Sequence, residues 1–142
     1  MKEYSFVRPK EPDYHVFPKG NLLGDVWYHG TSAEAFEAIR VGGFKTGMEL
    51  GKSPLETVSF ARHACTALAH VCARRAAGVS GVIIAVKFEP LKPSAVDAGL
   101  RRWTIRTEGD VQYLGLIPPT EQGGNLIELV AFCRVPPEYR HV

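Results

Sequence analysis

The chain has 142 residues, enough for one domain with its own core, and its 45% hydrophobic and 23% charged content is ordinary for a globular protein. The formal net charge of +2 does not indicate the strongly basic surface of a nucleic-acid-binding protein. No apolar run approaches the roughly 18 residues of a membrane-spanning helix, and the first residues lack the apolar core of a secretory signal.

The first 24 residues contain several prolines and glycines among charged residues, a pattern that predicts an extended N-terminal arm with little regular structure. Residues 25–142 are expected to form a single domain. Its first element is a short strand over 25–29, which is rich in β-prone residues.

A helix is expected next, over residues 33–40. Thr31 and Glu34 have the spacing of a capping box at its start. The consecutive glycines 42–43 predict its end, because glycine is the usual residue just past a helix C-terminus.

The rest of the chain combines one longer helix with several strands. Residues 57–60 predict a short strand that leads into a helix reaching about residue 77, with small apolar residues at intervals of three and four. Residues 81–88 are apolar almost throughout and predict a central strand. The remaining segments are a loop with one helical turn over 94–107 and strands over 110–117 and 126–134. This order of elements indicates an α+β fold.

The three cysteines indicate a reducing, cytoplasmic site of action. Their number is odd, and Cys65, Cys72 and Cys133 form no Cys-x-x-Cys or Cys/His pattern of the kind that binds zinc. We therefore expect no metal site.

Three separated clusters carry residues suited to chemistry: Tyr28-His29-Gly30-Thr31, Val58-Ser59-Phe60 and the segment 107–111. In the first cluster, a histidine at the end of a strand offers a hydrogen-bond donor and an acceptor at neutral pH. The glycine after it lets a flat ligand approach the backbone closely. We interpret this cluster as one edge of a ligand site.

The chain resembles the ADP-ribosyltransferase superfamily, with features of its diphtheria-toxin-like and cholera-toxin-like branches. The resemblance covers residues 26–134 and begins with Trp27–Ser32, followed by a helix and by Gly42-Gly43-Phe44. It implies a split β-sandwich with short helices and an NAD cleft between the two sheets.

The first motif of that family implies roles for two residues. The family's histidine binds the NAD ribose, and the backbone of the following glycine holds the nicotinamide amide. These roles fall on His29 and Gly30, with Thr31 beside them.

The second motif departs from the histidine-type pattern, in which two tyrosines eleven positions apart sandwich the nicotinamide ring. Ser59 and His70 occupy those positions here, and a serine at the first position is found in the cholera-like branch. The flat groups left to contact nicotinamide are Phe60, Tyr28 and His70.

The third motif contains Glu108 and Asp110 and resembles the cholera-like segment that reads acidic-x-acidic-Val. In the family the second acid bonds the ribose 2′-hydroxyl and stabilises the oxocarbenium-like cation as nicotinamide leaves. The resemblance assigns this role to Asp110 and an auxiliary role to Glu108, or the catalytic role to Glu108 in a shifted register. A fixed carboxylate suits the reaction because it stabilises the positive charge that develops on the sugar.

These residues also have ordinary structural explanations. Ser59 suits a helix N-cap, and His70 suits a packed or exposed position on a helix. The two acids suit a solvated turn. Four basic residues are expected on a solvated helical face, with phosphate binding as the minor alternative: Arg62, His63, Arg74 and Arg75.

The resemblance implies a mono-ADP-ribosyltransferase that uses NAD as substrate and transfers ADP-ribose to a macromolecule, as bacterial toxin and effector domains do. Close alternatives are an NAD-dependent tRNA 2′-phosphotransferase-like enzyme and an NAD glycohydrolase. The alternative of another class is a catalytically inactive module that binds a nucleotide or a partner protein. The departures at Ser59, His70 and Asp110 make this last alternative a serious one.

The expected partners follow from the same resemblance. The paired acids favour a protein over a nucleic acid as acceptor, and no membrane partner is expected. A toxin or effector of this kind implies a cognate inhibitor or immunity protein, and delivery by secretion as part of a larger protein.

Overall fold

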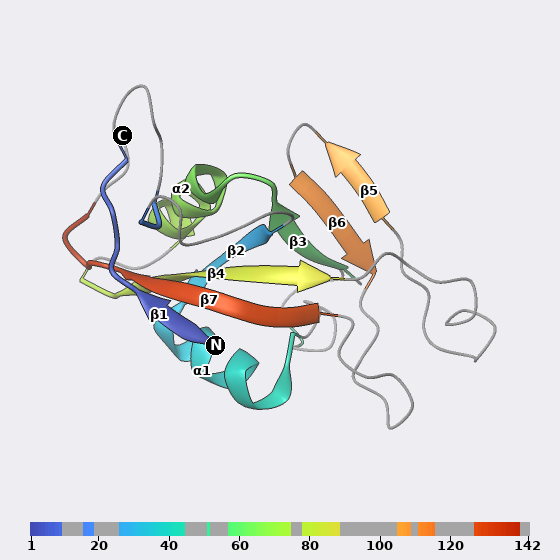
Figure 1. The fold of residues 1–142 in the computed structure, drawn as a ribbon, viewed down its shortest axis with the longest axis horizontal. Coiled ribbons are helices and arrows are strands. Elements are labelled where there is room, and N and C mark those ends of the chain that lie inside the picture. The colour runs from blue at the N-terminus through green and yellow to red at the C-terminus, as the bar shows by residue number, and fades with distance from the viewer. Residues whose placement is uncertain are drawn as a thin grey trace.

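The computed structural model describes residues 1–9, 16–18, 26–44, 51, 57–74, 78–88, 105–108, 111–115 and 127–139. In chain order the elements are β1 (Lys2–Tyr4), β2 (Trp27–Ser32), α1 (Ala33–Gly42), β3 (Thr57–Ala61), α2 (Ala64–Arg74), β4 (Gly81–Phe88), β5 (Ile105–Glu108), β6 (Val111–Gly115) and β7 (Ile127–Val135) (Figure 1). Helices and mainly antiparallel strands occur together, which agrees with the α+β class expected from the sequence.

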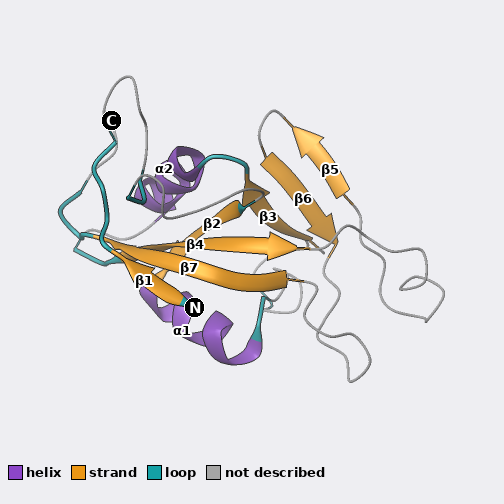
Figure 2. Cartoon of the chain, viewed as in Figure 1, coloured by secondary structure: helices purple, strands orange, loops and turns teal. Residues whose placement is uncertain are grey.

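The strands form a seven-stranded mixed sheet in the order β1-β7-β4-β2-β3-β6-β5. Among the described strands, only β1 runs parallel to its neighbour. β4 lies in the interior of this order and residues 81–86 are buried, which confirms the central strand expected from its apolar sequence. Figure 2 shows the two helices packed outside the sheet.

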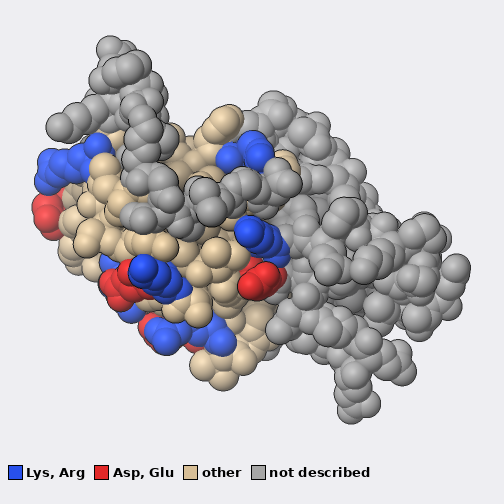
Figure 3. Space-filling view, viewed as in Figure 1, with Lys and Arg blue, Asp and Glu red and all other residues tan. Residues whose placement is uncertain are grey.

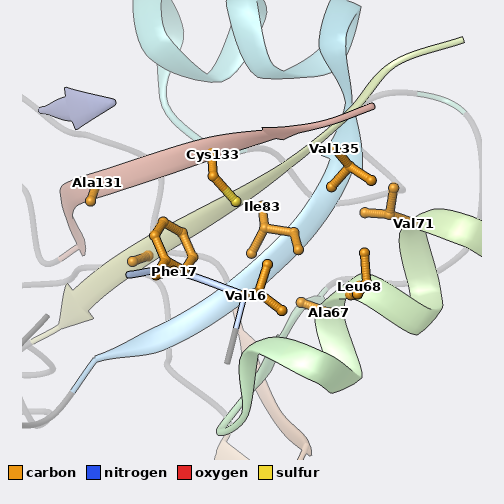
Figure 4. Packing of buried hydrophobic residues seen from close by; sticks show 10 residues of the cluster. Val16, Phe17, Ala67, Leu68, Val71, Ile83, Ala131, Cys133 and Val135 are labelled. Atoms are coloured by element: carbon orange, nitrogen blue, oxygen red, sulfur yellow. The ribbon is translucent and has the colours of Figure 1, made fainter. Parts of the chain in front are cut away.

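β4 separates two hydrophobic cores, because successive side chains of a strand point to opposite faces. Its even-numbered residues 82, 84 and 86 pack with α1, whereas residues 83 and 85 pack with α2. In the second core, Ile83 lies among side chains of α2 and β7 (Figure 4). The two helices therefore cover opposite faces of the sheet.

The first 24 residues contribute more to the fold than an extended arm would. Lys2–Tyr4 form β1, which pairs with residues 131–133 of β7. Val16 and Phe17 are 0% and 5% exposed and belong to the core shared with α2. A three-residue strand and an isolated buried pair leave no periodic pattern, so the prolines and glycines dominated the sequence-based expectation.

α1 begins at Ala33, as expected, but its N-cap is not the residue that the capping-box spacing predicts. Ser32 is its N-cap, and the Ser32 hydroxyl accepts a hydrogen bond from the Ala35 N–H at 3.1 Å. The expectation that Thr31 caps the helix is therefore wrong, since Thr31 still belongs to β2. The expected glycine stop is confirmed: Gly43 follows α1 with a φ of 79°, and its N–H donates to the Ile39 carbonyl at 2.8 Å.

The later elements also differ in part from the expectations. The loop expected over 94–107 is wrong for its last residues, because Ile105–Glu108 form β5 and pair with β6. The part of that segment before residue 105 lies outside the described residues, as do residues 75–77 of the long helix. Neither described helix is long and apolar enough to cross a membrane.

Candidate functional site

The sheet has few backbone pairs between β2 and β3. Within the described residues these strands share one pair, Tyr28 with Ala61, whereas β2 shares six pairs with β4 and β3 shares five with β6. The strands therefore divide into two groups, β1-β7-β4-β2 and β3-β6-β5, and Figure 1 shows the second group inclined to the first. We call this junction, residues 26–29 and 59–62, the seam.

His29 lies at the seam, and its ring is held by contacts from two other segments. Its Nδ1 atom is 2.9 Å from the backbone oxygen of Ser59 in β3. The ring centroid lies 5.0 Å from that of Phe44 and 5.6 Å from that of Phe60, and the two phenylalanine rings are 5.2 Å apart. Because both phenylalanines are buried, they give the imidazole a fixed support.

The surroundings of His29 determine its protonation state. A carbonyl oxygen only accepts hydrogen bonds, so the contact with Ser59 places the proton on Nδ1. Burial lowers the pKa of His29 to about 4, an effect that the bond to Ser59 opposes and the charge of His70 reinforces. The ring is therefore neutral at pH 7, and Nε2 carries a lone pair able to accept a hydrogen bond.

Gly30 and Thr31 continue β2 beyond His29. Gly30 is buried, and a Cβ atom there would collide with the backbone carbonyl of Ala67 in α2. A glycine is thus required at this position for helix packing, independently of any ligand. Thr31 is partly buried and lies on the same face of β2 as His29, since side chains two residues apart share a face.

Ser59 and His70 both lie near His29. Ser59 is in the middle of β3, where its backbone pairs with Tyr113, so the expectation of a helix N-cap is wrong. The Ser59 side chain is exposed. His70 is exposed on α2, and it is close enough to lower the pKa of His29. The seam thus gathers residues of the first and second sequence clusters.

Phe60 and Tyr28 do not offer a ring to a ligand beside His29. Phe60 is 0% exposed and supports the imidazole from inside the core. Tyr28 projects from the opposite face of β2, where its ring centroid lies 5.8 Å from that of Phe17 and burial raises its pKa. The positions of the two rings do not favour the expectation that either stacks on nicotinamide, which stays a prediction.

Glu108 is connected to the seam by the strand register. It is the last residue of β5 and pairs with Val111, which pairs with Ala61, which pairs with Tyr28. Three interstrand steps of roughly 4.8 Å therefore separate the backbones of Glu108 and Tyr28 along one row. The side chain of Glu108 and the whole of Asp110 lie outside the described residues, although Val111 directly follows Asp110 in the chain.

Two residues, one in the seam and one that contacts His29 from outside it, were not expected to matter there. Arg62 was expected on a solvated helical face, but it precedes α2, and its NH1 donates to the Val26 carbonyl at 2.7 Å. Phe44 was noted only as part of a motif. A large apolar residue directly after the glycines that stop α1 is the signal that could have identified it as buried.

Acidic and basic groups are intermixed on the described surface. Figure 3 shows them next to one another on the face that it presents. Arg134 lies 3.7 Å from both Glu3 and Glu37, and Arg40 lies 3.5 Å from Glu37. Within the described ranges, no group of three or more His, Cys, Asp or Glu residues could hold a metal ion.

Comparisons with known proteins assign no family to this arrangement. No family model matches the sequence, and no curated protein is significantly similar to it.

Proposed function

We propose that this chain is a mono-ADP-ribosyltransferase that cleaves NAD at the nicotinamide–ribose bond and transfers ADP-ribose to a protein. The observation that carries the proposal is the fixed neutral imidazole of His29 at the seam. Its Nε2 atom suits a ribose hydroxyl, which is a hydrogen-bond donor. In this proposal the two groups of strands are the halves of a split β-sandwich, and NAD lies along the seam.

The acidic end of the β5–β6 pair supplies the charge that the reaction needs. When the bond between the ribose and nicotinamide breaks, its electron pair leaves with nicotinamide, and positive charge develops on the ribose. A carboxylate of Glu108 or Asp110 would stabilise that charge more strongly than it stabilises bound NAD. A nucleophile of the acceptor then forms the new bond to the ribose carbon and releases its proton. The register that connects Glu108 with Tyr28 supports this role.

A catalytically inactive nucleotide-binding module is the second candidate function. It is favoured by the absence of a ring pair around the site: in the described part of the chain, Phe60 is buried and Tyr28 lies across the sheet. A nicotinamide held by His70 alone would lose a stacking contact worth roughly 0.5–1.5 kcal/mol. Such a site could bind a nucleotide without orienting it for cleavage.

Nicotinamide release from NAD by the full chain tests the proposal. We expect release by the wild-type protein and at least a tenfold fall in kcat/KM for His29→Ala. His63→Ala is the matched control, because His63 is exposed and its ring makes no contact with the ring of His29 among the described interactions. Labelled NAD added to a cell lysate should mark the protein fraction. Label in neither macromolecular fraction would indicate a glycohydrolase, and a thermal shift with NAD but no release would indicate the binding module.

A further inference from the structure

We propose that Arg62 is a positioning residue for His29. It holds β2 against β3 on the side of the Tyr28–Ala61 pair opposite to His29, and so keeps the imidazole in place. This inference rests on the proposed function only in treating His29 as the residue that contacts ligand. Arg62 is not one of the paired residues that connect Tyr28 with Glu108. It acts on His29 through the backbone of β2.

The contacts of Arg62 reach across the seam to residues just before His29. Its NH1 donates to the carbonyl of Val26 at 2.7 Å, and its guanidinium lies 5.2 Å from the ring centroid of Trp27. Val26 is 5% exposed, so its carbonyl needs a protein partner. A planar guanidinium can donate to this carbonyl and contact the indole at the same time.

Two hydrogen bonds that cross the seam are reciprocal. His29, which follows Tyr28 in β2, donates to the backbone of Ser59 in β3. Arg62, which follows Ala61 in β3, donates to the backbone of Val26 just before β2. Among the described residues, Tyr28–Ala61 is the one backbone pair of this junction, and each bond stands on one side of it, where a ladder bond would otherwise lie.

This arrangement makes the orientation of His29 depend on Arg62. One backbone pair leaves β2 able to rotate relative to β3 unless side-chain hydrogen bonds hold the strands on both sides of that pair. With Arg62 bound to Val26, the start of β2 is fixed and the imidazole stays within reach of the Ser59 carbonyl. Without it, the bond from Nδ1 lengthens and the proton can move to Nε2, which would then no longer accept a hydrogen bond.

Imidazole ¹⁵N NMR of the full chain tests this role without requiring NAD. We expect the wild-type protein and Arg40→Met to show His29 protonated on Nδ1. Arg40 is the matched control, because its guanidinium also contacts aromatic rings, those of Phe36 and Phe132, but lies on α1. For Arg62→Met we expect a mixture of the two tautomers.

Arg62→Lys provides the rescue, since a lysine keeps a donor for the Val26 carbonyl and should restore the Nδ1 tautomer. A folded Arg62→Met with the wild-type His29 spectrum overturns the proposal. If Arg62→Met does not fold, Arg62→Gln, whose shorter side chain carries no charge, takes its place, and a wild-type His29 spectrum in that variant overturns the proposal as well.

Turnover separates this inference from the proposed function. If the wild-type protein releases nicotinamide, we expect Arg62→Met to raise the KM for NAD about tenfold with a smaller change in kcat. If the wild-type protein releases none, the proposed function fails, whereas the NMR result still decides whether Arg62 positions His29.

Discussion

The imidazole of His29 donates a 2.9 Å hydrogen bond to the backbone carbonyl of Ser59 where β2 and β3, in the part of the chain that the structure describes, share one residue pair. A side chain thus does what a backbone ladder does elsewhere in the sheet. The bond fixes which ring nitrogen carries the proton, and the neighbouring phenylalanines fix the plane of the ring. The predictions on the pKa and the orientation of His29 follow from this contact.

Stability should depend on pH through His29. Burial lowers its pKa to about 4 in the folded state, compared with 6.5 for the ordinary side chain. Between these values the unfolded chain binds more protons, so the free energy of unfolding should fall as pH falls from 6.5 to about 4. The slope from this residue is at most about 1.4 kcal/mol per pH unit. Urea denaturation of wild-type protein and His29→Gln over this range checks it, and equal pH slopes would contradict it.

His70→Ala should raise the pKa of His29. The charge of His70 contributes to the lowered value, although burial is the larger cause. Titration of the imidazole NMR signals would measure the change, with His63→Ala as the control. An unchanged titration of His29 would show that His70 does not face the seam.

Phe44→Leu should weaken the packing around the His29 ring without leaving a large cavity in the core. The substitution removes the edge contacts of this ring with His29 and Phe60, which are worth roughly 0.5–1.5 kcal/mol each. Phe36→Leu is a suitable control because it removes a ring contact with Phe132 in the same core. Both variants should lower the free energy of unfolding, but only Phe44→Leu should move the pKa of His29. A similar pKa in both variants would argue against the ring support.

Gly30→Ala should be strongly destabilising. The added methyl group collides with the Ala67 carbonyl, and overpacking of this kind costs about 1–3 kcal/mol or more. Gly42→Ala is the matched control, since a Cβ atom there meets nothing within 4 Å. Alanine at the end of α1 should be neutral or stabilise the protein by up to about 1 kcal/mol. Thermal unfolding of the two variants measures the difference, and similar melting temperatures would be inconsistent with the packing described.

If the proposed function holds, removing the proposed catalytic acid should abolish most turnover. We expect either Asp110→Asn or Glu108→Gln to lower the rate of nicotinamide release by about 10²–10³, as loss of a transition-state charge contact does. Binding of NAD, followed by its thermal shift, should change much less. The variant with the larger loss identifies the acid. Unchanged turnover in both variants would remove the proposed mechanism.

The fold was predictable where the sequence carries a strong local pattern. Residues 81–88 are a continuous apolar run and form β4 with the expected bounds, and the glycines at 42–43 end α1 as expected. β1 and the buried pair Val16–Phe17 were not predictable, because their stability comes from partners distant in the chain. Local patterns carry no information about such partners.

The site was predictable in its residues and less so in their contacts. His29 and Ser59 were selected from the sequence, but their hydrogen bond depends on how β2 and β3 separate, a tertiary property. Alternation along β2 could have placed Tyr28 on the face away from His29. Arg62 resembled an ordinary surface residue, since its partner carbonyl is 36 positions away.

Gly30 and Gly81 both lie against α2, yet they constrain the evolution of the chain differently. A methyl group on Gly81 would meet mainly the side chain of Val71, so a smaller residue at 71 could compensate for a larger one at 81. A methyl group on Gly30 would meet the main chain of Ala67, which every amino acid at that position retains. Residue 81 can therefore be substituted together with residue 71. Gly30 has no side-chain partner that could compensate in this way, so it can be substituted only if α2 itself moves.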